Sequence, residues 1–200
     1  GINPADVSVT NTDDDAAGIT VSAISGATSE SGGSASFTVV LDAQPSASVT
    51  IGLSSGDTTE GTVSPSTLVF TTANWSTPQV VTVTGVNDGL DDGDVTFSVI
   101  TTAATSSDTS YSGMNPADVS VTNVDDDAAG ITVSAISANT TEAGGTATFT
   151  VVLDSQPTAT VTIGLSTSDP SEGTVSASSL TFTTANWGTP QAVTVSGVDD

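Results

Sequence analysis

The strongest constraint on the fold of this chain is an internal repeat. Residues 3–88 realign without a gap on residues 115–200, with a period of 112 residues, and 65 of the 86 paired positions are identical. Most differences exchange small residues such as Ser, Thr, Ala and Gly, whereas every Asp and Glu of the first copy stays acidic in the second. Two copies this similar must share one fold, so the sequence predicts a repeated structural unit that keeps its carboxylates.

The repeat sets the expected domain boundaries. Residues 1–15 match the end of a repeat, so we expect the closing strand and Asp triplet of a preceding one. Residues 16–127 make one complete repeat, and residues 128–200 make a second that stops before its last two strands. Neither a membrane span of about 20 apolar residues nor a basic stretch ahead of an apolar one is present. We therefore interpret the chain as an internal fragment.

Alternation of apolar and polar residues predicts β-strands within the repeat. Turn signals such as Gly32-Gly33, Gln44-Pro45 and Asn87-Asp88-Gly89 separate the alternating segments. The expected strands cover residues 19–23, 35–41, 49–53, 68–70, 81–83, 95–99 and 119–121. Seven short strands in about 110 residues are typical of an immunoglobulin-like sandwich. We therefore expect an all-β fold of tandem antiparallel sandwiches stacked head to tail.

The charge balance is the second constraint. The chain has 23 Asp and Glu residues and no Lys, Arg or His, which gives a formal net charge of −23 at pH 7. No basic side chain can neutralise these carboxylates, so a compact form should need cations, and the oxygen-rich composition favours hard divalent ions such as Ca²⁺. The absence of basic residues excludes nucleic acid as a partner. The absence of cysteine excludes disulfides and zinc–thiolate sites.

Catalysis is not expected from this composition. Without His, Cys or Lys the chain cannot form a catalytic triad, a thiolate nucleophile or a Schiff base. A pair of carboxylates could hydrolyse glycosides, but such a pair needs a cleft, whereas the acidic residues here crowd one end of the predicted sandwich. We therefore expect a protein that is not an enzyme.

Most carboxylates fall at one end of the predicted sandwich when the chain is followed as it reverses at each turn. Four segments contribute them: Glu30; Asp57 and Glu60; Asp88, Asp91, Asp92 and Asp94; and Asp125, Asp126 and Asp127. The other end receives Asp42, Asp108 and Asp118. Any one acidic loop could be a solvated turn, because Asp favours turns. Convergence of four favours bound cations, since two charges about 5 Å apart repel by about 3 kcal/mol at an effective dielectric of 20.

Calcium is the cation that suits this set of ligands best. It takes six to eight oxygen ligands in irregular geometry, whereas magnesium demands a stricter octahedron and transition metals recruit His or Cys. Residues 88–94 superficially resemble an EF-hand loop, with Asp residues around Gly93. However, no closing Glu follows and strands flank the segment, so an EF-hand is rejected.

The repeat resembles the Calx-β domain and the related cadherin-like repeats of giant bacterial adhesins of the RTX type, which use type I secretion. The matching motifs are Glu30-Ser-Gly-Gly, the acidic loop 88–94, the segment Thr72–Gln79 and the Val-Thr-Asn-Val-Asp-Asp-Asp that ends at Asp127. The resemblance covers the whole period. It implies calcium ligands at Glu30, Asp57, Asp88, Asp91, Asp92 and Asp125 to Asp127, with Glu142, Asp169, Asp199 and Asp200 at matching positions of the second copy. By the same resemblance, Asp13, Asp14 and Asp15 would close the site of a preceding repeat.

The sequence is compatible with three functions. The first is a calcium-rigidified structural extender in the stalk of a long secreted or cell-surface adhesin, whose partners are calcium ions and neighbouring repeats. The second is a self-associating subunit of an extracellular filament or surface layer. The third is a polysaccharide-binding module, which would need exposed aromatic residues, and the chain has only two Trp, one Tyr and five Phe. All three predict a location outside the cell or on a bacterial surface, without membrane insertion.

Overall fold

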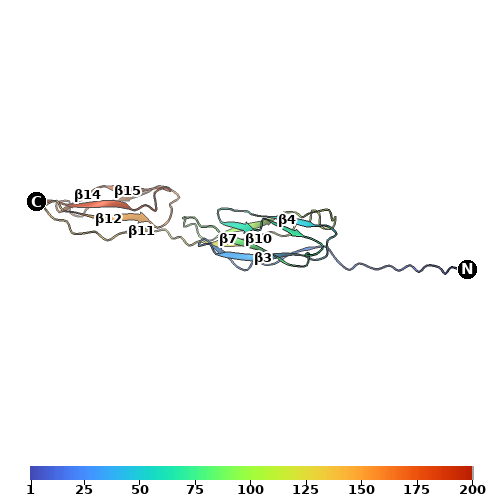
Figure 1. The fold of residues 1–200 in the computed structure, drawn as a ribbon. Helices are drawn as coiled ribbons and strands as arrows, with labels where there is room; N and C mark the ends of the chain where they lie inside the picture. Colours follow the sequence, from blue (N-terminus) through green and yellow to red (C-terminus); the bar gives the residue numbers. More distant parts are fainter. Residues whose placement is uncertain (200) are drawn as a thin grey trace. The chain divides into compact units, whose positions relative to one another are not determined.

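The computed structural model describes residues 1–199, whose regular structure is entirely β (Figure 1). They form two compact units. Unit 1 comprises Gly1–Thr28, Gly32–Gly85 and Thr96–Thr122, and unit 2 comprises Ser29–Ser31, Val86–Val95 and the residues from Asn123 on. The predicted all-β fold is thereby confirmed. Among the described residues, no helix has the length and apolar character needed to cross a membrane.

The first repeat folds as two sheets that enclose one core. The first sheet has the order β1-β3-β7-β5, and the second has the order β2-β10-β8-β4-β6, with β9 also pairing on β4. The strands are β1 Ile19–Val21, β2 Thr28–Ser29, β3 Ser34–Leu41, β4 Val49–Ser55, β5 Gly61–Ser64, β6 Thr67–Phe70, β7 Gln79–Gly85, β8 Val95–Thr101, β9 Thr105–Ser106 and β10 Val119–Val124.

Period-two alternation builds this core. In β3 every second side chain from Ala35 to Leu41 is buried, because successive side chains of a strand point to opposite faces of the sheet. Val81 and Val83 of β7 join the same cluster, as do side chains of β4, β6, β8 and β10 from the other sheet. All seven strands expected from the sequence are present. The short strands β2, β5 and β9 were not predicted, because their sequences Thr-Ser, Gly-Thr-Val-Ser and Thr-Ser contain at most one large apolar residue and so show no alternation.

The second repeat reproduces the first sheet. Its strands are β11 Ile131–Val133, β12 Thr146–Leu153, β13 Val161–Gly164, β14 Gly173–Val175, β15 Ser179–Phe182 and β16 Gln191–Gly197. The order β11-β12-β16-β14 copies β1-β3-β7-β5, and the pairing of Ile131 with Leu153 copies that of Ile19 with Leu41. The second sheet differs, because within the described chain β13 pairs with β15 alone, whereas its counterpart β4 also pairs with β8 and β9.

Residues 1–18 form no strand, and residues 1–16 are exposed (Figure 1). We expected a closing strand here, because residues 3–12 match residues 115–124 of β10 at nine of ten positions. β10 forms because it lies between β2 and β8. Residues 1–12 have no such neighbours among the described residues, and a strand without a partner leaves its backbone groups unpaired.

A buried tyrosine ties the loop before β10 to the end of β3. Tyr111 is 1% exposed, and its hydroxyl donates to the Ala43 carbonyl oxygen at 2.5 Å while accepting from the Ala43 N–H at 3.1 Å. One hydroxyl thereby satisfies both backbone groups of a buried residue.

We expect Tyr111→Phe to lower the free energy of unfolding by roughly 1–3 kcal/mol, because it would leave the Ala43 backbone groups buried and unpaired. Urea denaturation measures the change. Thr109→Val removes an exposed hydroxyl from the same loop and should change stability little. Equal losses in the two variants would contradict this role of Tyr111.

Candidate metal centre

Glu30 is the most buried carboxylate of the acidic segments. It directly follows β2, and its N–H donates to the Val124 carbonyl oxygen at 3.0 Å, which continues the pairing of β2 with β10. Its side chain is only 3% exposed, and the buried Oε2 has no hydrogen-bond partner among the described residues. An ionised oxygen in that position is costly unless a cation or a proton compensates its charge.

The Asp triplet 125–127 meets Glu30 because it follows β10, the neighbour of β2. One ligand oxygen from each of Glu30, Asp125 and Asp127 can be chosen so that all three lie within 4.8 Å of one another. Backbone donors orient Asp125: the Gly93 N–H reaches Oδ2 at 2.8 Å and the Asp127 N–H reaches Oδ1 at 2.9 Å. The structure therefore gathers three carboxylates, one of which is the Glu30 side chain with its unpaired Oε2.

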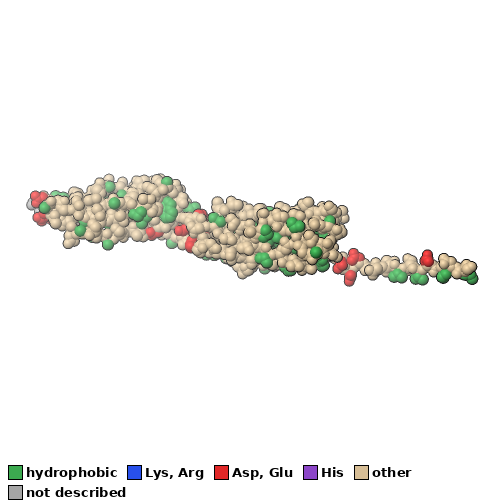
Figure 2. All heavy atoms as spheres, viewed as in Figure 1, with side chains coloured by type: hydrophobic (Ala, Val, Ile, Leu, Met, Phe, Trp, Pro, Cys, Tyr) green, Lys and Arg blue, Asp and Glu red, His purple; other side chains and the backbone are tan. Residues whose placement is uncertain are grey.

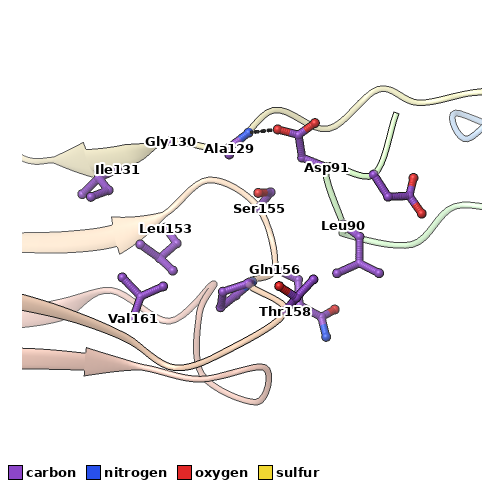
Figure 3. A pocket seen from close by; sticks show the side chains of 12 residues that line it. Leu90, Asp91, Ala129, Gly130, Ile131, Leu153, Ser155, Gln156, Thr158 and Val161 are labelled. Atoms are coloured by element: carbon purple, nitrogen blue, oxygen red, sulfur yellow. Dashed lines mark hydrogen bonds between the residues drawn. The ribbon is translucent and has the colours of Figure 1, made fainter. Parts of the chain in front are cut away.

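The acidic loop between β7 and β8 is held against the triplet by its own carboxylates. Asp94 Oδ1 accepts the Asp125 N–H at 3.3 Å, and Asp91 Oδ2 accepts the Ala129 N–H at 2.7 Å, the bond drawn in Figure 3. Asp91 and Asp94 thus fix the path of the chain as it leaves β10.

A second acidic group occurs in the first repeat. Glu60 precedes β5, which pairs with β7, and Asp88 and Asp92 follow β7. Ligand oxygens of these three residues also lie within 4.8 Å of one another. Glu60 is buried, whereas Asp92 is exposed. The structure therefore contains two acidic groups that could hold a metal ion.

The electrostatics of the first group favour uptake of a positive charge. Burial raises the pKa of Glu30 from 4.5 to about 7, the charges of Asp88, Asp125 and Asp127 add to the rise, and a backbone hydrogen bond from Asp126 opposes it. Burial and the neighbouring carboxylates also raise the pKa of Asp127. The N–H groups of Asp127 and Gly93 hold the pKa of Asp125 below its usual range. Without a cation, the Glu30 carboxyl therefore takes up its proton near pH 7 instead of near pH 4.5.

Two predicted ligands, Asp57 and Asp169, accept hydrogen bonds within their own turns. Asp57 Oδ1 accepts the Thr59 N–H at 3.0 Å and the Thr59 hydroxyl at 2.6 Å. Asp169 repeats the arrangement with Ser171, at 3.1 and 2.5 Å. These hydrogen bonds lower the pKa of both carboxyl groups, the hydroxyl having the largest effect. Neither residue belongs to the two acidic groups.

The remaining predicted ligands that the structure describes are exposed. Glu142, the counterpart of the buried Glu30, is exposed, as are Asp126 and Asp199. Asp13, Asp14 and Asp15 are exposed too, with the Asp15 N–H donating to Asp13 Oδ1 at 3.1 Å. Asp200 lies outside the described residues. None of these exposed carboxylates belongs to the two acidic groups.

Sequence reasoning overlooked one residue that positions the Glu30 site. Gly93 was not singled out, although its N–H anchors Asp125 and its φ of 77° is one that glycine adopts readily. The Asp-Asp-Gly-Asp pattern at 91–94 was the available signal.

A mainly apolar hollow lies beside the acidic loop within unit 2. Its volume is about 460 Å³, and Figure 3 shows Leu90 and Asp91 on one side of it, with Ile131, Leu153 and Val161 on the other. The Gln156 N–H donates to the Gly89 carbonyl oxygen at 2.5 Å. This lining offers apolar contacts and carboxylates.

No protein-family model matches the chain, and no curated protein matches it either. Seventeen chains of solved structures match it, and three of them show how distant the similarity is. The CBD12 structure from CALX1.2 is 16% identical, with a TM-score of 0.40 over 87% of this chain and 73% of that one. The calcium binding domain CBD12 of CALX1.1 is 18% identical, with a TM-score of 0.37 over 88% and 73%. The YadV chaperone is 12% identical, with a TM-score of 0.37 over 88% and 84%. Likenesses this weak settle neither fold nor function.

We expect the raised pKa of Glu30 to make the calcium-free protein more stable in mild acid. The folded state takes up a proton near pH 7 that the unfolded chain takes up only near 4.5, so stability falls as the pH rises through this window. Above pH 7, Glu30→Gln should recover roughly 3 kcal/mol. Urea denaturation in chelator at about pH 5.5 and about pH 8 measures this.

Glu142→Gln is the matched control for that experiment, because it removes the same charge from the exposed counterpart position. It reports the effect of net charge alone. If the free energy of unfolding depends on pH as steeply in Glu30→Gln as in Glu142→Gln, the role assigned to Glu30 is contradicted.

Proposed function

We propose that the group formed by Glu30, Asp125 and Asp127 binds Ca²⁺, and that the chain is a non-enzymatic, calcium-rigidified stalk segment of a long extracellular or cell-surface protein. The observation that carries the proposal is the buried Oε2 of Glu30, which has no hydrogen-bond partner in the described chain, on a side chain that offers a ligand oxygen within 4.8 Å of those of Asp125 and Asp127. A bound cation would compensate that charge and turn the repulsion within the group into attraction.

The chemistry of the donors supports calcium over other ions. The group offers carboxylate oxygens alone, and the chain has no His or Cys to attract a transition metal. Two of the three carboxylates are partly exposed, so water can supply further ligands. Calcium accepts such mixed and irregular coordination, whereas magnesium requires a near-ideal octahedron.

Binding would fix the direction in which the chain leaves the sandwich. Glu30 stands at the end of β2, and the Asp triplet stands at the end of β10. An ion between them would join two neighbouring strand ends and restrain residues 125–130, where the bond from the Ala129 N–H to Asp91 already limits movement. Repetition of this arrangement every 112 residues would give a stiff array of head-to-tail sandwiches, as the stalk of an adhesin requires.

Self-association into a filament or surface layer is the second candidate. The exposed apolar side chains of the N-terminal segment favour it, with Ile2 100%, Val7 88% and Val9 86% exposed. Polysaccharide binding has less support, because Trp75 and Trp187 are both partly buried and pack against the cores.

We expect calcium to bind and to stabilise the protein, with Glu30→Gln or Asp125→Asn weakening the affinity at least about tenfold, because each removes one of three clustered charges. Isothermal titration calorimetry measures the affinity. Asp42→Asn is the control, since Asp42 is exposed and accepts the Thr20 hydroxyl at 2.7 Å, outside both acidic groups. Equal weakening in all three variants would remove the basis for this site.

The stalk proposal predicts a stiff particle in calcium. Small-angle scattering should show a maximum dimension that grows linearly as further copies of residues 16–127 are added in tandem. In chelator the same chains should bend, because repulsion at the strand ends is no longer compensated. A calcium form whose dimension does not grow with the number of copies would overturn the stalk function but not the calcium site.

A further inference from the structure

The acidic loop of the first repeat, residues 86–95, belongs to unit 2, the compact unit that also contains the second repeat. Two contacts with the second repeat hold this loop. The Gln156 N–H donates to the Gly89 carbonyl oxygen at 2.5 Å. A side chain at Gly89 would place its Cβ 3.0 Å from Cζ2 of Trp187, so the Trp187 ring lies directly against the Gly89 backbone. Glycine at position 89 therefore permits this close approach.

The turn that carries Trp187 fixes this residue in place. The Trp187 N–H donates to the Thr183 carbonyl oxygen at 3.1 Å, and the Trp187 carbonyl oxygen accepts the Leu153 N–H at 3.2 Å. Asn186 Oδ1 closes the same turn by accepting the Thr183 N–H at 2.6 Å, and the Trp187 side chain packs against the core of the second repeat. The first repeat builds the turn of Trp75 in the same way. Trp187 is therefore a fixed support for the acidic loop.

The same loop orients the proposed calcium ligands. Two residues after Gly89, Asp91 Oδ2 accepts the Ala129 N–H at 2.7 Å, which holds the chain that leaves β10 (Figure 3). Four residues after Gly89, the Gly93 N–H donates to Asp125 Oδ2 at 2.8 Å. Because only three residues separate Gly89 from Gly93, a loop displaced at Gly89 would carry both of these groups away from their partners.

The surface that receives the acidic loop is a feature of a complete repeat. In the first repeat, side chains of the segment between β9 and β10 accept the N–H groups of Ala43 and Ser46. Gln44, the counterpart of Gln156, lies between these two residues and takes part in neither bond. Trp75 is only partly buried in the first repeat. The two contacts of the acidic loop therefore use positions that these bonds of a complete repeat leave accessible.

We propose that Trp187 and Gln156 are positioning residues for the calcium site of the preceding repeat. They hold the acidic loop at Gly89, and the loop in turn orients Asp125, so the second repeat raises the calcium affinity of the site at the end of the first. The effect on affinity rests on the proposed calcium function, whereas the seating of the loop on the second repeat does not. Because such coupling is reciprocal, calcium should also stabilise the loop in its seated position.

Calcium titration of the 200-residue chain with substitutions at this contact tests the proposal. Trp187→Phe keeps an aromatic ring against the core but replaces the indole by a smaller ring, and Gly89→Ala adds a methyl group against Trp187. Each should weaken the calcium affinity at least about fivefold in isothermal titration calorimetry. Trp75→Phe and Gly26→Ala are the matched controls, since Trp75 occupies the same turn of the first repeat and a Cβ at Gly26 meets open space. Both controls should bind calcium like the wild type.

The double variant Gly89→Ala/Trp187→Phe separates the contact from general damage to the fold. The smaller ring leaves room for the added methyl group, so the double variant should bind calcium no more weakly than Trp187→Phe alone. Losses of affinity that add in the double variant would overturn the proposal, because the two positions would then act independently. Equal losses in all four single variants would also overturn it, and so would Trp187→Phe that binds as tightly as Trp75→Phe.

Hydrogen exchange in chelator separates this proposal from the calcium function. The amides of residues 86–95 should exchange several-fold faster in Trp187→Phe than in Trp75→Phe, because the loop is no longer held at Gly89. Faster exchange in a protein whose wild type binds no calcium would overturn the calcium function and the effect on affinity, and would support the seating of the loop. Unchanged exchange in a protein whose wild type binds calcium would overturn the role of Trp187 and leave the calcium function intact.

Discussion

Carboxylates without basic partners are the constraint on which the rest of this structure depends. A chain with 23 acidic residues and no Lys, Arg or His has backbone N–H groups and hydroxyls as its main internal partners for negative charge. Many acidic side chains use them: Asp108 accepts N–H groups of Ser46 and Ser110, and Asp118 accepts the Thr101 N–H. Figure 2 accordingly shows acidic side chains in small groups and no basic ones. Glu30 Oε2 is the buried oxygen for which the described chain supplies no such donor.

The acidic residues fall into two kinds, according to whether the protein supplies hydrogen-bond donors to all of the carboxylate oxygens. Asp57 and Asp169 close short turns with the side chain two residues on, so their charge is already satisfied and a cation would have to displace those hydrogen bonds. Asp125 also accepts two N–H groups, yet it stands beside Glu30, whose second oxygen is bare. A cation binds most favourably where the protein supplies the fewest hydrogen-bond donors to the carboxylate oxygens. This favours the group that contains Glu30 over isolated acidic turns.

The sequence predicted the strands that carry this site, and the end of the sandwich at which it lies, better than the contacts of the individual loop side chains. Alternation such as that of Phe37, Val39 and Leu41 located the main strands, and following the chain from turn to turn put Glu30 at the same end as the Asp triplet. Strand direction determines at which end a loop lies, but not where a loop side chain points. Asp57 was therefore grouped with Glu30, although the neighbouring Thr59 captures its carboxylate. The anchoring role of Gly93 depends on loop geometry, which alternation does not report.

The two copies also show why local sequence is insufficient for such a fold. Val7 and Val119 have nearly identical neighbours in sequence, yet one is exposed and the other buried, and Glu30 and Glu142 differ in the same way. What differs is the presence of adjacent strands, because pairing in a sheet joins residues far apart in the chain. Burial is what raises the pKa of Glu30, so the site acquires its chemistry only when strand β10 closes the sandwich. Strand completion and ion binding are therefore expected to be thermodynamically linked, each favouring the other, in every repeat that carries this pattern.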